Sequence, residues 1–428
     1  MNIKTLLRRK TIQNANWLIG GKIIQMILSL FIGLITARYL GPGNYGLINY
    51  GTAYTTFFSS LCTLGLNGIL VKEMIDYPDS EGEIVGTSIV IRELSSIFSL
   101  LTIVGCTIVF DKSDNLTTAV VILCNISLLF QVFDTFNFWF QAHLMSKYTA
   151  IATLIAYIIV SIYRIILLIG GLDVRWFAFA TSVDYIVIAV FLLCIYKKCS
   201  KQKLSFSSIR AKNMLRKSYH FILSGMMVSI YNSTDRLMLK QMLSETSVGY
   251  YSTAISICTM WAFVLVAVID SMTPGIMQYF KSDKDKYEKR NKQLYAIIFY
   301  LSSFVSLILC VFGKLIIGIL YGKQYLSAVD PLRVITWYVA FSYLGSARNA
   351  WLVCENKQSY LKYIYVFAAI ANIILNYLFI PIWGATGAAV ASLITQFCTC
   401  IVFPSFLKPL RANSKLMINA IFLKGVFK

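Results

Sequence analysis

Charge and the residue types of soluble enzymes are scarce in this sequence. Only 14% of the 428 residues are charged and only two are histidines, His143 and His220, whereas a soluble domain carries about 25% charged residues. No Walker loop, dinucleotide fingerprint or HExxH motif occurs, which argues against ATP-driven transport by this chain alone. The ten cysteines are scattered and form no CxxC motif or Cys/His cluster. We therefore expect no catalytic residue, no metal site and no cofactor.

Apolar residues dominate what is present. They make up 57% of the chain, the mean hydropathy is +0.68, and runs of about 20 apolar residues, enough for a helix to cross a bilayer, recur throughout. The first run is longer than that of a signal peptide and lacks a small-residue cleavage site after it. The sequence predicts an all-α polytopic membrane protein with about twelve transmembrane helices. They are expected at residues 12–37, 44–70, 84–110, 115–141, 148–170, 174–196, 218–240, 248–273, 294–313, 331–354, 360–380 and 384–407.

Two stretches of the chain, 203 residues apart, share one plan. Each has an apolar run, a polar turn with a glycine, and an aromatic-rich helix start. The matched residues include Leu34 with Leu237 and Gly46 with Gly249. Such self-similarity predicts two halves built alike. We place an N-lobe at 1–196, a cytoplasmic linker at 197–217, a C-lobe at 218–408 and a basic amphipathic tail at 409–428.

The distribution of lysine and arginine predicts the orientation. If the N-terminus is cytoplasmic, the inner segments hold 27 of these residues and the outer loops hold 6. Short inner loops of membrane proteins carry this excess of positive charge. We therefore expect both termini in the cytoplasm. The formal charge of +20 then reflects topology and anionic lipid headgroups, and no nucleic-acid partner is expected.

Ionisable residues inside the predicted spans are candidate functional residues. A charge at the centre of a bilayer costs about 2.5–3.5 kcal/mol by insertion scales, so each one needs a reason. A binding role for an anionic substrate is one reason, and snorkelling or a local ion pair is the other. The candidates for substrate binding are Lys22, Arg236 and Arg348. The candidates for counter-ions or proton carriers are Asp235, Asp184 and Asp134.

Three separated stretches resemble one known family. The opening ITARYLGPGNYGLINYGTAYTTFFSSLCTLGLNGILVKEM is similar to its ARxLGPxxYGxY pattern, LGL turn and V(K/R)E. The stretch NSTDRLMLKQMLSETSVGYYSTAISI is similar to its seventh span, with a DR pair and a VGxYSxA turn. The last three spans of the family commonly show YGxxYxxA, NxxLNxxLIP and GxxGAAxA, and residues 320–396 are similar to them. The sequence thus resembles the Wzx-type flippases of the multidrug/oligosaccharidyl-lipid/polysaccharide exporter superfamily.

This resemblance implies two six-helix lobes around a central cavity and transport by alternating access. It also implies a bacterial cytoplasmic (inner) membrane protein that moves undecaprenyl-diphosphate-linked oligosaccharide for surface polysaccharide, such as O-antigen or capsule. Membrane lipids and other polysaccharide-assembly membrane proteins are the partners it suggests. A proton and Na⁺ both stay open as the coupling ion.

Three other functions stay open, and one of them is a passive scaffold in a glycan-assembly complex, which would tolerate loss of every buried charge. A cation-coupled drug antiporter of the same superfamily would share the fold. A membrane glycan polymerase or ligase would be an enzyme, but such enzymes usually carry a large outer loop with catalytic residues. The largest outer loop expected here, 313–330, is short and has Asp330 as its one acid.

Overall fold

The chain folds almost entirely into helices. The computed structural model describes residues 3–111, 114–200 and 202–426, with the side chains of residues 3–24, 26 and 27 outside the description. Within these ranges there is no β-strand. Eight stretches there are long and apolar enough to cross a membrane, and two of them, Leu28–Asp76 and Gln358–Phe406, are 49 residues long and reach across two predicted spans each. The predicted all-α polytopic membrane class is confirmed.

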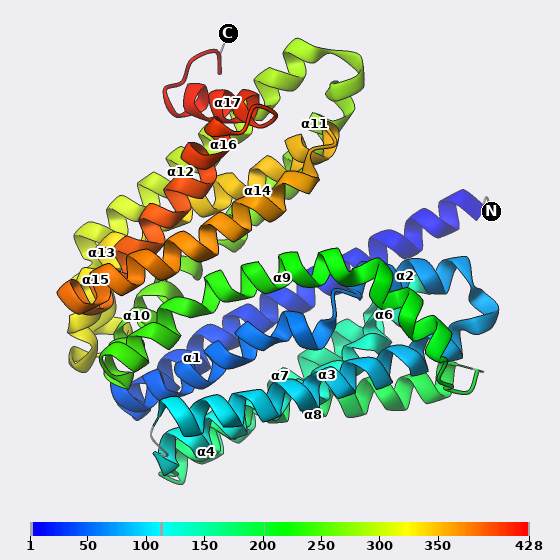
Figure 1. Cartoon of the computed structure of the whole chain (residues 1–428), viewed down its shortest axis with the longest axis horizontal. Helices are drawn as coiled ribbons and strands as arrows, with labels where there is room; N and C mark the ends of the chain where they lie inside the picture. Colours follow the sequence, from blue (N-terminus) through cyan, green and yellow to red (C-terminus); the bar gives the residue numbers. More distant parts are fainter. Residues whose placement is uncertain (1–2, 112–113, 201, 427–428) are drawn as a thin grey trace. The chain divides into compact units, whose positions relative to one another are not determined.

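Contacts divide the chain into two compact units. Unit 1 comprises residues 1–40 and 47–229. Its long helices α3, α7 and α8 are visible in Figure 1, and α8 packs against both α7 and α4. The helices of this unit are α1 (Ile3–Thr63), α2 (Asn67–Asp76), η1 (Pro78–Ser80), α3 (Glu81–Phe110), α4 (Asn115–Asn125), α5 (Ser127–Gln131), η2 (Val132–Asp134), α6 (Thr135–Ala142), α7 (Lys147–Ile169), α8 (Val174–Cys199) and the first part of α9 (Ser208–Met242).

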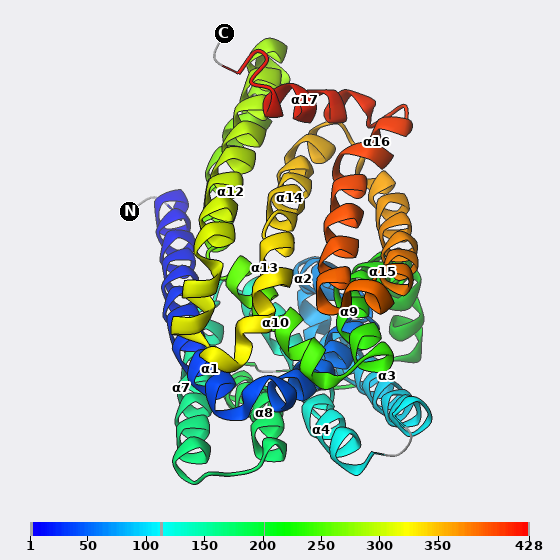
Figure 2. The same ribbon diagram turned by 90° about the vertical axis from the view of Figure 1, so that its left-hand side faces the viewer.

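Unit 2 comprises residues 41–46 and 230–428. In Figure 2, α12 and α14 run along this unit and α17 lies across their ends. After the end of α9, its helices are α10 (Glu245–Thr259), α11 (Phe263–Ser282), α12 (Lys284–Leu320), η3 (Lys323–Ala328), α13 (Val329–Ile335), α14 (Tyr338–Cys354), η4 (Gln358–Tyr360), α15 (Leu361–Phe397), the π-helix η5 (Cys398–Val402), α16 (Phe403–Phe406) and α17 (Arg411–Ile421). The unit boundary falls inside α9, and the lobe boundaries expected at residues 196 and 218 stay a prediction.

Two glycines with positive φ bend the longest helices. Gly41 (φ 70°) is followed by Pro42 in α1, and Gly384 (φ 58°) follows Pro381 in α15. A residue with a Cβ atom rarely adopts such angles, and proline removes a backbone donor, so both sites interrupt the helix. The bend at Gly41 falls between the spans predicted at 12–37 and 44–70. The bend at Gly384 falls at the first residue of the span predicted at 384–407, which follows the one predicted at 360–380.

The surfaces of the long helices are apolar. On α12, the exposed side chains Phe304, Val311, Leu315 and Ile319 follow one another at spacings of four or seven residues. This spacing places them in one stripe along the helix. Such a stripe would be an aggregation-prone patch on a soluble protein, and it suits a helix that faces lipid.

The segment 197–217 is bound to unit 1, although the sequence suggested a simple linker. The Gln202 side chain accepts a hydrogen bond from the Gly82 backbone N (2.8 Å) and donates to the Pro78 carbonyl (2.8 Å). The Ser207 backbone N donates to Thr87 Oγ1 (3.0 Å). Polar composition predicted a loop here, but its polar groups are used in contacts with η1 and α3.

The charged end of this segment is fixed as well. Arg210 Nε donates to Glu83 Oε1 at 2.9 Å, and Arg210 Nη1 lies 3.6 Å from Glu73 Oε2. Lys217 donates to the other oxygen of Glu73, and this hydrogen bond raises the pKa of the Lys217 ammonium. These ion pairs connect α9 to α2 and α3.

Candidate functional site

A buried carboxylate in unit 2 gathers four hydrogen-bond donors. Asp235 lies in α9 and is 6% exposed. Its Oδ1 accepts from the amide nitrogens of Asn372 (3.0 Å) and Asn376 (2.6 Å). Its Oδ2 accepts from Ser392 Oγ (2.5 Å) and from the hydroxyl of Tyr251. We call these five residues the Asp235 cluster.

Helix geometry explains how the cluster forms. Asn372 and Asn376 are four residues apart in α15, so their side chains share one face. Ser392 lies beyond the bend at Gly384, which lets the second arm of α15 approach the same carboxylate. Tyr251 comes from α10 and also bonds Ser392, at 3.2 Å between the two hydroxyl oxygens. The cluster therefore joins α9, α10 and both arms of α15.

The chemistry of the Asp235 cluster suits a small cation or a proton. Asp235 makes no ion pair with any side chain that the structure describes, so only uncharged donors balance its charge. The Oδ1 atom of Asn376 is buried and has no hydrogen-bond partner among the described residues. Carboxylate, amide and hydroxyl oxygens are the ligands that hard cations prefer. No group of three or more His, Cys, Asp and Glu residues occurs in the described ranges, so a transition-metal site is not indicated there.

Polar contacts continue one turn beyond the cluster. Tyr231, one turn before Asp235 in α9, donates its hydroxyl hydrogen to Gln396 Oε1 at 2.6 Å. Gln396 lies one turn after Ser392 in α15. Buried polar groups that satisfy one another fix the packing of their helices, because an unpaired partner is costly in an apolar surrounding.

The two arginine candidates of unit 2 have different surroundings. Arg236 follows Asp235 but makes no ion pair with it, since adjacent residues on a helix point in different directions. Its Nε is buried without a hydrogen-bond partner in the described part of the chain. Arg348, in α14 and 4% exposed, donates from Nη1 to the carbonyl oxygens of Thr399 (3.4 Å) and Cys400 (3.3 Å) in the π-helix. These contacts give Arg348 a structural role, and its predicted substrate role stays a prediction.

The acids Asp134 and Asp184 lie in unit 1, near the buried Arg92 and the half-buried Arg164. Asp134 interacts electrostatically with Arg92 and with Asp184, and Asp184 interacts with Arg164. Arg92 is 1% exposed and donates to Thr135 Oγ1 (2.7 Å) and to the Gln131 carbonyl (3.2 Å). Unit 1 thus places charges of both signs near one another, and Arg92 is the buried one among them.

Lys22 lies within α1, but its side chain falls outside the described residues. The structure therefore leaves its predicted role in substrate binding as a prediction. Sequence reasoning also missed Asn372, Asn376, Tyr251 and Ser392. The spacing of the two asparagines in NIILN was the available signal, since it puts two amides on one face of an apolar helix.

Known proteins resemble this chain over most of its length. The family model described as "Polysaccharide biosynthesis protein" matches residues 11–280. The capsular polysaccharide biosynthesis protein CapF of Staphylococcus aureus is 19% identical over 411 residues, which cover 93% of this chain and 99% of that protein. An uncharacterized membrane protein of Methanocaldococcus jannaschii, MJ1068, is 24% identical over 58% of this chain, and the match spans 52% of that relative's length.

Solved structures share the fold. The lipid II flippase MurJ in an inward closed conformation superposes with a TM-score of 0.73, at 15% identity, over 94% of this chain and 89% of that one. An inward-facing multidrug resistance transporter of the MATE family, in the MOP superfamily, superposes with a TM-score of 0.68, at 16% identity, over 92% of this chain and 96% of that one. At such identities these structures indicate a common architecture, and the expected resemblance to the exporter superfamily is confirmed.

Proposed function

This chain belongs to the polysaccharide biosynthesis protein family, and we propose that it is a flippase for lipid-linked oligosaccharide repeat units. The family match over residues 11–280 carries this proposal. The similarity to a capsular polysaccharide protein along nearly the whole of both chains supports a cargo used for surface polysaccharide. The fold shared with a lipid II flippase supports a lipid-linked cargo. The lipid that we propose is undecaprenyl diphosphate, and the protein acts as a transporter rather than an enzyme.

Alternating access is the mechanism that we propose. The two halves rock so that a polar cavity opens first to one side of the membrane and then to the other. The sugar headgroup crosses through the cavity while the prenyl chain stays in lipid. Lys22 and Arg236 are the first candidates to hold the diphosphate, because a cation inside a span needs a compensating partner. Arg348 is a weaker candidate, since main-chain carbonyls already occupy its guanidinium.

The Asp235 cluster is our proposed coupling site. Its carboxylate is buried among neutral donors, and its amide and hydroxyl oxygens could hold Na⁺ or surround a bound proton. Asp134 and Asp184 are second candidates, because each lies near an arginine that already compensates its charge. Movement of a cation down its gradient would then drive the return of the empty transporter.

The proposed location is the cytoplasmic membrane, with both termini in the cytoplasm. The excess of lysine and arginine in the segments on that side supports this orientation. We propose that the cargo enters from this side. Other membrane proteins of polysaccharide assembly would receive it on the outer side.

Cells that lack the gene test this function. In spheroplasts, a membrane-impermeant oxidant should modify lipid-linked oligosaccharide in the wild type. In the deletion strain the same lipid should accumulate and become reactive only after the membrane is permeabilised. Unchanged reactivity in intact deletion spheroplasts would contradict the proposal.

A drug antiporter is the second candidate function, supported by the fold shared with a multidrug resistance transporter. It predicts that deletion raises sensitivity to toxic organic cations while polysaccharide export continues. A polymerase or ligase predicts instead that lipid-linked units reach the outer face and stay unpolymerised. The spheroplast experiment and a growth assay in toxic cations separate all three.

A further inference from the structure

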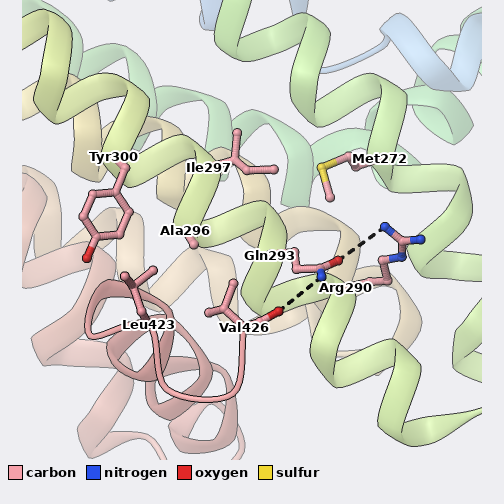
Figure 3. A pocket seen from close by; sticks show the side chains of 8 residues that line it. All are labelled: Met272, Arg290, Gln293, Ala296, Ile297, Tyr300, Leu423 and Val426. Carbon is pink, nitrogen blue, oxygen red and sulfur yellow. Dashed lines mark hydrogen bonds between the residues drawn. The ribbon is translucent and has the colours of Figure 1, made fainter. Parts of the chain in front are cut away.

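Unit 2 contains a cleft at one end of α12. Figure 3 shows its walls, which come from α11, from α12 and from the chain that follows α17. The cleft has a volume of about 480 Å³, within the range of small-molecule sites. Its walls are mostly apolar and are formed by Met272, Ala296, Ile297, Leu423, Val426 and the ring of Tyr300. We call it the tail cleft.

The C-terminal segment is a fixed wall of this cleft. Tyr300 donates its hydroxyl hydrogen to the Ile421 carbonyl (2.7 Å), and Gln293 Nε2 donates to the Val426 carbonyl (3.2 Å). Asn413, in α17, donates to the buried Tyr295 hydroxyl at 2.7 Å. The predicted amphipathic tail is therefore hydrogen-bonded to α12 at three positions, and two of these bonds are made by the lining residues Tyr300 and Gln293.

One basic residue, Arg290, lines the cleft, and two more, Lys292 and Lys424, are sequence neighbours of the lining residues Gln293 and Leu423. Arg290 is exposed and donates from Nη1 to Gln293 Oε1 at 3.3 Å, as Figure 3 shows. The Lys292 ammonium lies near the backbone of Gly425, 3.3 Å from where a Cβ atom would stand. Lys424, which precedes Gly425 in the chain, is exposed. None of these three cations makes an ion pair with a side chain in the described ranges.

The cleft lies where α12 changes character. The helix begins with the basic run KDKYEKRNK, residues 284–292, and continues with the apolar run LYAIIFYL, residues 294–301. In a membrane helix such a change marks the level of the lipid headgroups. An apolar cleft with a lining arginine and two neighbouring lysines, at this level, complements a molecule with a phosphate above an acyl chain.

We propose that the tail cleft binds one anionic phospholipid of the surrounding bilayer. Its phosphate contacts Arg290, Lys292 and Lys424, and the first part of an acyl chain lies against Ala296, Ile297 and Leu423. The bound lipid fastens the C-terminal segment to α12. The proposal does not depend on what the protein carries.

Native mass spectrometry of the purified full chain tests the site. The probes are phosphatidylglycerol, phosphatidylcholine, inorganic phosphate and undecaprenyl phosphate. Wild type should retain one phosphatidylglycerol more tightly than phosphatidylcholine. Arg290→Gln should weaken phosphatidylglycerol binding roughly fivefold, the worth of one basic residue at a lipid surface. Lys284→Gln is the matched control, because it removes an exposed charge from the same basic run without touching the cleft, and it should bind as wild type does.

A second variant tests the apolar part. Ala296→Leu adds bulk to the cleft wall and should weaken retention of both phospholipids. Its melting temperature is compared with that of the Arg290→Gln protein to verify that it is folded. Equal binding of the two phospholipids would overturn the proposal, and so would equal effects of Arg290→Gln and Lys284→Gln. Displacement of phosphatidylglycerol by inorganic phosphate alone would reduce the cleft to an anion site. Tighter retention of undecaprenyl phosphate would assign it to the cargo instead, and either result refutes a bilayer phospholipid as its ligand.

Discussion

The backbone at Gly46 approaches that of Glu245 so closely that a Cβ atom at position 46 would lie 1.8 Å from the Glu245 carbonyl oxygen. The reciprocal contact has the same form, since a Cβ atom at Gly249 would lie 2.0 Å from the Pro42 carbonyl oxygen. The 203-residue shift relates Gly46 to Gly249 and Pro42 to Glu245. All four belong to unit 2. The equivalent segments of the internal repeat, 42–46 and 245–249, are thus in backbone contact with each other.

This contact predicts that neither glycine tolerates a side chain. Gly46→Ala and Gly249→Ala should each cost about 1–3 kcal/mol or more of stability, because backbone atoms must move apart. Detergent-solubilised protein should show a lower melting temperature for both. Gly318→Ala, at a helix glycine with nothing within 4 Å of the added atom, is the control. A melting temperature of Gly46→Ala equal to that of the wild type would show that the backbones at Gly46 and Glu245 are not in close contact.

Asp235→Asn should abolish export at normal or mildly reduced membrane abundance. The amide keeps the shape but loses the charge, and its NH₂ group would face donors and leave one or more of them unpaired, at about 1–3 kcal/mol each. Asp270→Asn, at an exposed acid in α11, is the matched control and should export normally. Export is measured as polymer per unit of membrane protein.

The cation itself gives an independent readout of the Asp235 cluster. If Na⁺ binds there, it should raise the melting temperature of purified wild-type protein above that in K⁺, and Asp235→Asn should lose this difference. Equal melting temperatures of the wild type in Na⁺ and in K⁺ would remove the Asp235 cluster as a Na⁺ site.

Insertion into the segment 197–217 should be damaging. A flexible insert between Ser205 and Ser208 would break the contacts of Ser207 with Thr87 and of Arg210 with Glu83. We expect lower membrane abundance and lower export than for the same insert after Gly171, in an exposed turn of unit 1. Full export with the insert at Ser205 would mean that the segment only connects two helices.

Lys22 remains the sequence-based candidate for the diphosphate. A compact positive charge is the property that matters, so Lys22→Arg should keep part of the export while Lys22→Ala and Lys22→Glu lose it. Polymer export is compared with membrane protein level for all three variants. Normal export by Lys22→Ala would leave Arg236 as the next candidate.

The sequence predicted the membrane class, and it singled out Asp235, around which the structure gathers the Asp235 cluster. Long apolar runs have few structural solutions, and a charge inside one, such as Asp235, is conspicuous. The partners of Asp235 were hidden because asparagine, serine and tyrosine occur in many apolar helices. Their convergence depends on the bend at Gly384, which brings Ser392 to the carboxylate.

The contacts of the segment 197–217 could not be predicted from the sequence. Its polar, charged composition is typical of an exposed loop, and composition alone carries no information on long-range partners. Gln202 and Arg210 find theirs in η1, α2 and α3, more than a hundred residues earlier in the chain.

Transport in reconstituted liposomes is the most direct test of the proposed flippase activity. Purified protein in liposomes with undecaprenyl-diphosphate-linked oligosaccharide should make the inner-leaflet fraction of that lipid reactive to an impermeant oxidant. The rate of oxidation of the inner-leaflet lipid should exceed that in protein-free liposomes. It should fall to the protein-free level in two cases, with the Asp235→Asn protein and with wild-type protein in the absence of a cation gradient. The contradicting result is oxidation that stops at the outer-leaflet fraction although wild-type protein and the gradient are present and the melting transition shows that the protein is folded. This result would refute the proposed flippase activity.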